Sequence, residues 1–159
     1  MPEAGTVSRI GLMFSARKLR TAAMNGDVGR VRSLLAQGAN PNAQDNHGWT
    51  ALRFAVNSDE PEIVRLLVGS GADPSMQDKF GTSPVHAAMT VKSARAFEAL
   101  RQENVDFNVR NGSGKTPLQA ISEDIEVLQN SQFPEMRATG TQLLAMRVLL
   151  LIHLSGRSN

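Results

Sequence analysis

The residues of this chain that could carry out chemistry are few, and none of them forms a convincing catalytic or ligand-binding pattern. The stretch Gly112-Ser113-Gly114-Lys115-Thr116 is similar to the end of a phosphate-binding loop. Such a loop needs a further glycine five residues before the glycine of the Gly-Lys pair, after a buried strand. Val109 stands at that position and Pro117 follows at once, so the stretch lacks the full pattern of a nucleotide site.

Metal and acid–base sites are equally hard to find. The three histidines, His47, His86 and His153, are far apart, and no pair of carboxylates has ligand spacing with them. The chain has no cysteine, which excludes disulfides and thiolate metal sites. No Gly-x-Ser-x-Gly elbow is present either. The sequence therefore predicts no catalytic residue, no metal ligand and no cofactor, and we interpret the chain as not an enzyme.

The rest of the chain is organised around a phrase of turn residues and a helix start that occurs three times. The copies start at Asp45, Asp78 and Asn111, 33 residues apart, and read DNHGWTALRFA, DKFGTSPVHAA and NGSGKTPLQAI. The spacing is the period of ankyrin repeats, and the phrase resembles that family's D-x-x-G-x-T-P-L-H-x-A. The resemblance implies an all-α repeat solenoid of about four repeats. Each is a helix-turn-helix with short β-turns, and the first and last act as caps.

The repeat register sets the expected boundaries. Residues 1–14 form a lead-in, and residues 15–156 form a single ankyrin-repeat domain. Its repeats span about 15–38, 39–71, 72–104 and 105–156, with an insertion near 122–141. We expect the helices of the first repeat at about 15–25 and 27–37.

The fourth repeat departs from the register. Its first helix is expected to extend to about Asn130, with a break at Pro134. A closing helix follows around 143–154. This apolar run contains Arg147 and His153 and is shorter than the roughly 20 residues that cross a bilayer, so we predict a buried helix and no membrane span.

Special backbone positions recur at the same period. Glycines in the turns before the first helices are expected at positive φ, and so are the residues that follow the second helices. Prolines are expected to begin first helices. Among the N-cap positions of second helices, Asp27 and Ser93 are good caps and Glu60 is a poorer one. The turn glycines are Gly48, Gly81 and Gly114, the C-terminal positions are Gly38, Gly71 and Asn104, and the prolines are Pro84 and Pro117.

His86 occupies the histidine of the family phrase, and the resemblance implies that it forms a hydrogen bond to the backbone between repeats. Arg53 and Gln119 stand at that position in other repeats. We expect weaker bonds between repeats there.

The same resemblance implies that the turn tips and the exposed sides of the first helices form a concave binding face. Position by position, the candidate partner-binding residues are Asn46, His47, Trp49, Asn57, Ser58, Lys79, Phe80, Thr82, Thr90, Val91 and Lys115. Ser113, and from the first repeat Phe14, Met24 and Asn25, are further candidates.

Trp49 and Phe80 are the candidate anchors of this face. Aromatic residues make up only 4% of the chain, yet its single tryptophan and Phe80 both fall on turn tips. Tryptophan is among the commonest anchors of protein interfaces. The alternative is that each ring folds back on its neighbouring repeat.

The function that these features favour is protein–protein interaction, with one narrower form and two alternatives. The narrower form is an inhibitor or immunity protein of a partner enzyme. One alternative is nucleic-acid association through the basic first repeat, which carries Arg17, Lys18 and Arg20; a solvated capping face explains these charges as well. The other is a small-ligand or enzyme role of the insertion. No signal peptide is visible, so we expect a cytoplasmic location, with a removed leader left open. The sequence does not set the oligomeric state.

Overall fold

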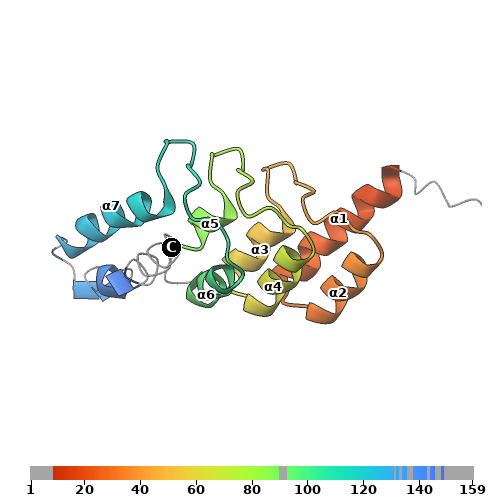
Figure 1. Cartoon of the computed structure of the whole chain (residues 1–159), viewed down its shortest axis with the longest axis horizontal. Coiled ribbons are helices and arrows are strands. Elements are labelled where there is room, and N and C mark those ends of the chain that lie inside the picture. Colours follow the sequence, from red (N-terminus) through yellow and green to blue (C-terminus); the bar gives the residue numbers. More distant parts are fainter. Residues whose placement is uncertain are drawn as a thin grey trace, which may run out of the picture.

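The computed structural model describes residues 9–89, 93–130, 132, 134–135, 138–142, 144–145 and 148. This part of the chain is helical and contains no strand, which confirms the all-α solenoid. Its helices are α1 (Arg9–Met24), α2 (Val28–Ala36), α3 (Ala51–Asn57), α4 (Pro61–Gly69), α5 (Pro84–Ala87), α6 (Ala94–Gln102) and α7 (Pro117–Gln129). The first helices of the repeats, α1, α3, α5 and α7, follow one another along the stack, and long loops project beyond them on one side (Figure 1).

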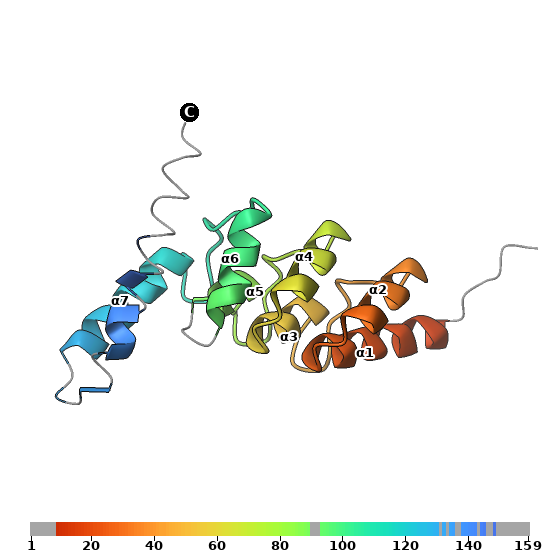
Figure 2. The ribbon, with the colours of Figure 1, turned by 90° about the horizontal axis from the view of Figure 1, so that it is seen from below.

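The second helices α2, α4 and α6 form a row beside the first helices, on the opposite side from the projecting loops (Figures 1 and 2). A continuous strip of buried side chains joins the two rows. The strip repeats with the sequence: Val31, Val64 and Phe97 are each at most 1% exposed. Small residues at Ala22, Ala55 and Ala88 are also buried, which allows the helices to approach closely.

Helix starts follow the expected chemistry at most repeats. The Asp27 side chain accepts a hydrogen bond from the Arg30 backbone N–H, and Thr116 and Gln119 form a capping box at α7. Pro84 and Pro117 each occupy the first turn of a helix, as predicted. Glu60 makes no side-chain cap, as its type indicated.

Ser93 was wrongly predicted to cap α6 with its side chain, since it makes no such hydrogen bond. The carboxylate of Asp59, from the preceding repeat, accepts the Ala96 N–H at 2.7 Å instead. Asp59 reaches it from a left-handed backbone conformation, with φ of 54°. The cap of one repeat is therefore supplied by its neighbour, which couples the two repeats.

The left-handed positions of the helix ends and turns agree with the sequence. Gly38, Gly71 and Asn104 have φ of 81°, 85° and 55°, and the turn glycines Gly48, Gly81 and Gly114 lie between 73° and 82°. Asparagine tolerates this region best after glycine, which explains its place at 104.

The first helix starts earlier than expected, whereas the end of α7 lies close to its expected position. α1 begins at Arg9, so part of the expected lead-in belongs to the first helix. α7 ends at Gln129 with Asn130 as its C-cap, close to the predicted extension. In the insertion, 134–135 and 138–142 are helical, and Gly140 lies against Leu128 of α7. The expected closing helix at 143–154 lies mostly outside the described residues. Within the described residues, no helix has both the length and the apolar character that a membrane span requires.

Candidate functional site

The projecting loops are built by one repeated side-chain turn. Asp45, Asp78 and Asn111 each accept hydrogen bonds from the backbone N–H groups two and four residues later, at 2.8–3.0 Å. A carboxylate and an amide oxygen can both do this, so the turn forms with aspartate or asparagine. The three tips consequently have the same backbone shape.

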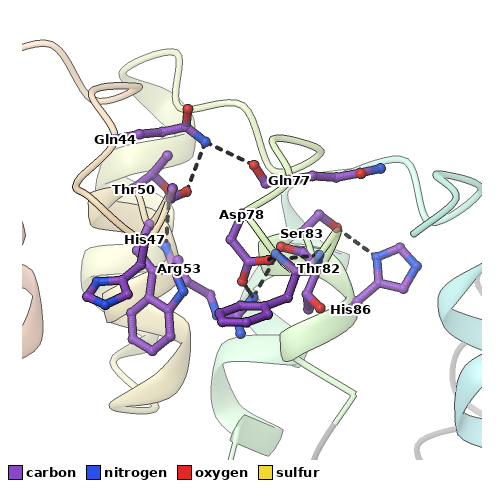
Figure 3. Close-up of polar contacts among 12 residues, drawn as sticks. Gln44, His47, Thr50, Arg53, Gln77, Asp78, Thr82, Ser83 and His86 are labelled. Carbon is purple, nitrogen blue, oxygen red and sulfur yellow. Dashed lines mark hydrogen bonds and ion pairs between the residues drawn. The ribbon is translucent and has the colours of Figure 1, made fainter. Parts of the chain in front are cut away.

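Neighbouring tips are joined to one another through their backbones. The Lys79 N–H donates to the His47 carbonyl at 3.0 Å, and the Gly112 N–H donates to the Gly81 carbonyl at 2.8 Å. The amide of Gln44 adds a bridge to the Gln77 carbonyl at 2.9 Å, which Figure 3 shows between the two tips. The tips thus form a linked row whose spacing is set by hydrogen bonds, and side chains on the row are presented at fixed positions.

This geometry removes the nucleotide hypothesis at 112–116. A phosphate-binding loop needs backbone N–H groups that are free to point at the ligand. Here the N–H groups of Gly112, Ser113, Gly114, Lys115 and Thr116 all donate within the protein. Among the described residues there is also no cluster of side chains that could hold a metal ion.

A side chain at the histidine position of each of the first three repeats binds a backbone carbonyl of the next repeat. These side chains stand 33 residues apart on α1, α3 and α5. Gln119 instead bonds within its own capping box. The pairs are Arg20 with the Ala43 carbonyl at 3.1 Å, Arg53 with Thr82 at 3.3 Å and His86 with Lys115 at 3.0 Å. The bond that the resemblance implied for His86 is present.

The buried His86 ring is held in one neutral form. Nε2 faces the Lys115 carbonyl, which can only accept, so Nε2 carries the proton and Nδ1 accepts from the Ser83 hydroxyl at 2.8 Å. Burial lowers the pKa of His86 below its ordinary value, and the charge of Arg53 lowers it further, against the bond to Lys115. The folded protein therefore disfavours the imidazolium.

We expect the free energy of unfolding to fall as the pH drops below about 6.5, the pKa of a free histidine. Below that pH the unfolded chain binds a proton at this histidine, whereas the folded chain does not. The contribution of His86 to stability is therefore fully present above about pH 6.5. It is lost as the pH falls from there to the lowered pKa of the folded state. One proton gives a slope of at most about 1.4 kcal/mol per pH unit. Urea denaturation between pH 7 and pH 5 measures it. The His86→Gln variant should show a smaller slope, and an unchanged slope would contradict this origin.

The first of the two aromatic candidates, Trp49, packs against side chains of its own repeat. Its ring lies under the Arg53 guanidinium, with Cζ 5.1 Å from the ring centroid, and meets Phe54 edge-on at 5.2 Å. Arg53 Nη1 in turn lies 3.3 Å from a carboxylate oxygen of Asp78, which is drawn in Figure 3. Trp49 is half-buried, and its indole N–H is buried without a partner among the described residues. Trp49 therefore packs on the fold, and its role as a partner-binding anchor stays a prediction.

Arg53 makes a longer carbonyl bond than His86, 3.3 Å against 3.0 Å, and adds an ion pair to Asp78 of the next repeat. Its side chain is only 14% exposed and that of Asp78 only 3%, so this ion pair is sheltered from water. Burial lowers the pKa of Arg53, and the Asp78 charge opposes that shift. Between repeats, arginine at this position makes an ion pair as well as the bond to a carbonyl, whereas histidine makes only the bond to a carbonyl.

Phe80, the second aromatic candidate, is 77% exposed at the tip of the next loop. Asn46, His47, Asn57, Ser58 and Lys79 are exposed as well, whereas Thr82 and Lys115 are half-buried. The Ser58 hydroxyl donates to the Met24 carbonyl, and Lys115 forms an ion pair with Glu123. Thr90 and Val91 lie outside the described residues. The row of tips therefore brings together His47, Lys79 and Phe80, while Asn57 and Ser58 stand at the far end of α3.

The sequence interpretation missed a groove beside α1. It is lined by Met13, Arg17, Arg20, Thr21 and Met24 from α1, together with residues 44–47 of the first tip and Phe54 of α3. Two methionines that flank two arginines at helical spacing were the available signal.

A stack of helix pairs that carries a row of backbone-linked tips is the architecture of a binding scaffold. The family described as ankyrin repeats (3 copies) matches residues 18–78 and 55–129, and the chain belongs to the ankyrin repeat family. Members of this family are generally protein–protein interaction modules and are typically not enzymes. No curated protein sequence matches the chain.

Proposed function

We propose that this chain binds a partner protein through its row of tips and concave face, with Phe80 as the main anchor. The observation that carries the proposal is the position of Phe80. A large aromatic ring is 77% exposed on a turn that Asp78 closes and that the bond from Lys79 to His47 ties to the previous tip. A ring held in place in this way can bury apolar area without ordering its backbone on binding.

The polar residues of the row support the same proposal. His47 and Lys79 are exposed on consecutive tips, and Asn46 precedes His47. Interfaces commonly surround an aromatic anchor with polar groups that fix its orientation. In this proposal Trp49 contributes by packing against Arg53, which holds the tip in place, and its exposed edge extends the apolar surface.

A narrower form of the proposal is that the partner is an enzyme and that binding inhibits it, as an immunity protein would, in the cytoplasm. We place this form second, because no contact among the described residues points to an enzyme as the partner. The described part of the insertion packs on α7, which favours a closing element over a separate ligand site.

Loss of the Phe80 ring should weaken partner binding more than tenfold while leaving the fold intact. Such a loss corresponds to about 1.4 kcal/mol or more, as expected for a central aromatic anchor. The partner is obtained by affinity capture and mass spectrometry, and its affinity for the Phe80→Ala variant is measured by calorimetry. Val127→Ala removes a comparably exposed side chain, 68% exposed on α7, and is the control. Equal affinity of the two variants would place the anchor elsewhere.

A further inference from the structure

The side of α1 that faces the first tip presents one stripe with two basic residues at its centre and an apolar residue at each end. Met13, Arg17, Arg20 and Met24 are spaced by four, three and four residues, so they lie on one face of the helix. Met13 is 73% and Met24 49% exposed. Two large apolar side chains on one helix face are thus left uncovered at the two ends of a basic centre.

The stripe forms one wall of the groove beside α1, which encloses about 560 Å³. The facing wall is the first tip, residues 44–47, with Phe54 behind it. The tip is fixed by the bridge from Gln44 to Gln77 and by the Asp45 turn, so this wall is rigid. A segment lying between these walls would contact α1 on one side and the tip on the other.

The side chains that line the groove carry more positive than negative charge. Arg17 is exposed and makes no ion pair or side-chain hydrogen bond in the described part of the chain. Arg20 donates one N–H to the Ala43 carbonyl and keeps other donors. The single carboxylate in the lining, Asp45, already accepts two backbone N–H groups and is only 22% exposed. The groove therefore offers unused guanidinium donors and little negative charge.

We propose that this groove binds a segment of the partner protein that carries an Asp or Glu side chain next to large apolar ones. A carboxylate matches the fork of a guanidinium, and Arg17 is free to bind it. Methionines adapt to apolar side chains of different shape, and Met13 and Met24 lie on either side of the charge. The inference rests on the proposed function and names the part of the partner that the first repeat recognises.

The apolar ends of the stripe favour a protein segment over nucleic acid. Nucleic-acid grooves follow a phosphate backbone with continuous basic charge and stacked aromatic rings. Here the arginines are flanked by methionines, and the rings in the lining are His47 and Phe54, with no run of stacked aromatic side chains. An acidic–apolar peptide satisfies both kinds of side chain at once.

The test selects peptides from a displayed library of random sequences of about a dozen residues on the immobilised full chain. We expect the selected peptides to share an Asp or Glu within two positions of Leu, Phe, Met or Trp. Their affinity, measured by fluorescence anisotropy, should fall at least about tenfold for Arg17→Gln and for the double variant Met13→Gln, Met24→Gln. Arg32→Gln is the matched control, because Arg32 is equally an exposed arginine of the first repeat but lies on α2, outside the groove. It should change the affinity less than twofold.

Other outcomes overturn the inference and separate it from the proposed function. Selected peptides without acidic residues, or acidic peptides that bind Arg17→Gln as tightly as the unchanged chain, would reject the groove. Retention of an oligo-dT strand that depends on Arg17, with no acidic peptide selected, would assign the groove to nucleic acid. If the chain self-associates and Arg17→Gln abolishes the self-association, the groove would instead bind a second copy of this chain. If the captured partner loses affinity for Phe80→Ala but not for Arg17→Gln, the proposed function stands and only this inference fails.

Discussion

Replacing Gly81 by valine is expected to lower the free energy of unfolding by about 3 kcal/mol. Gly81 has φ of 73°, where a β-branched residue is strained by roughly 1–3 kcal/mol. A Cβ at this position would also lie 2.4 Å from the Cα of Gly112 and 2.7 Å from its N. Both atoms are backbone, so they cannot swing aside, and the two tips must separate. That separation breaks the bond from Gly112 N–H to the Gly81 carbonyl, worth about 1 kcal/mol.

Gly114 provides a matched control for this effect. Its φ of 75° is nearly the same, yet a Cβ there would meet nothing within 4 Å. Gly114→Val should therefore show the same backbone strain alone, roughly 1–3 kcal/mol, and lose about 1 kcal/mol less than Gly81→Val. Urea denaturation followed by circular dichroism measures both variants. Equal losses would mean that contact between the tips adds nothing to the stability of the stack.

The repeat architecture could be predicted because its signals are local and recur at one period. The turn glycines, Asn104 and the prolines each depend on the backbone conformation of a single residue. Their identities in the sequence are therefore enough to place them. The apolar positions, such as Val31 and Val64, recur at the same spacing and are buried accordingly.

The candidate site was only partly predictable because the directions of its side chains depend on neighbouring repeats. Phe80 stands one period after His47, and both are exposed; Trp49 stands one period before Thr82, and both are half-buried. The repeat register therefore distinguishes the exposed ring of Phe80 from the half-buried ring of Trp49, although both lie on tips. The cap that Asp59 supplies to α6 could not be seen in either helix alone, since donor and acceptor lie 37 residues apart.

The sequence also contains a pairing that becomes meaningful only in the structure. Where the histidine position holds Arg53, the turn residue of the next tip is Asp78, and their side chains form a sheltered ion pair. Where it holds His86, the next turn residue is the neutral Asn111. Aspartate and asparagine close the turn equally well, so the charge of the turn residue matches the charge of the side chain that faces it.

Removing the Asp78 carboxylate should therefore be among the most damaging single changes in the chain. Asp78→Ala deletes the acceptor of two tip N–H groups and leaves the guanidinium of Arg53 buried without a counter-charge. Breaking one side of a buried ion pair typically costs about 3–5 kcal/mol. Asp45→Ala is the control, because Asp45 closes the same turn but pairs with no arginine in the described structure. Its loss should cost about 1–2 kcal/mol.

A double-mutant cycle tests the charge matching itself. The variants are Arg53→His, Asp78→Asn and the two together, which give this link the residues of the next one. In the double variant, the introduced histidine is expected to reach the Thr82 carbonyl as His86 reaches Lys115, while asparagine keeps the turn closed. Each single variant leaves one charge buried without its partner. We therefore expect the double variant to lose at least about 1 kcal/mol less than the sum of the two single losses. Thermal and urea denaturation of all four proteins gives the coupling energy, and additive losses would show that Arg53 and Asp78 act independently.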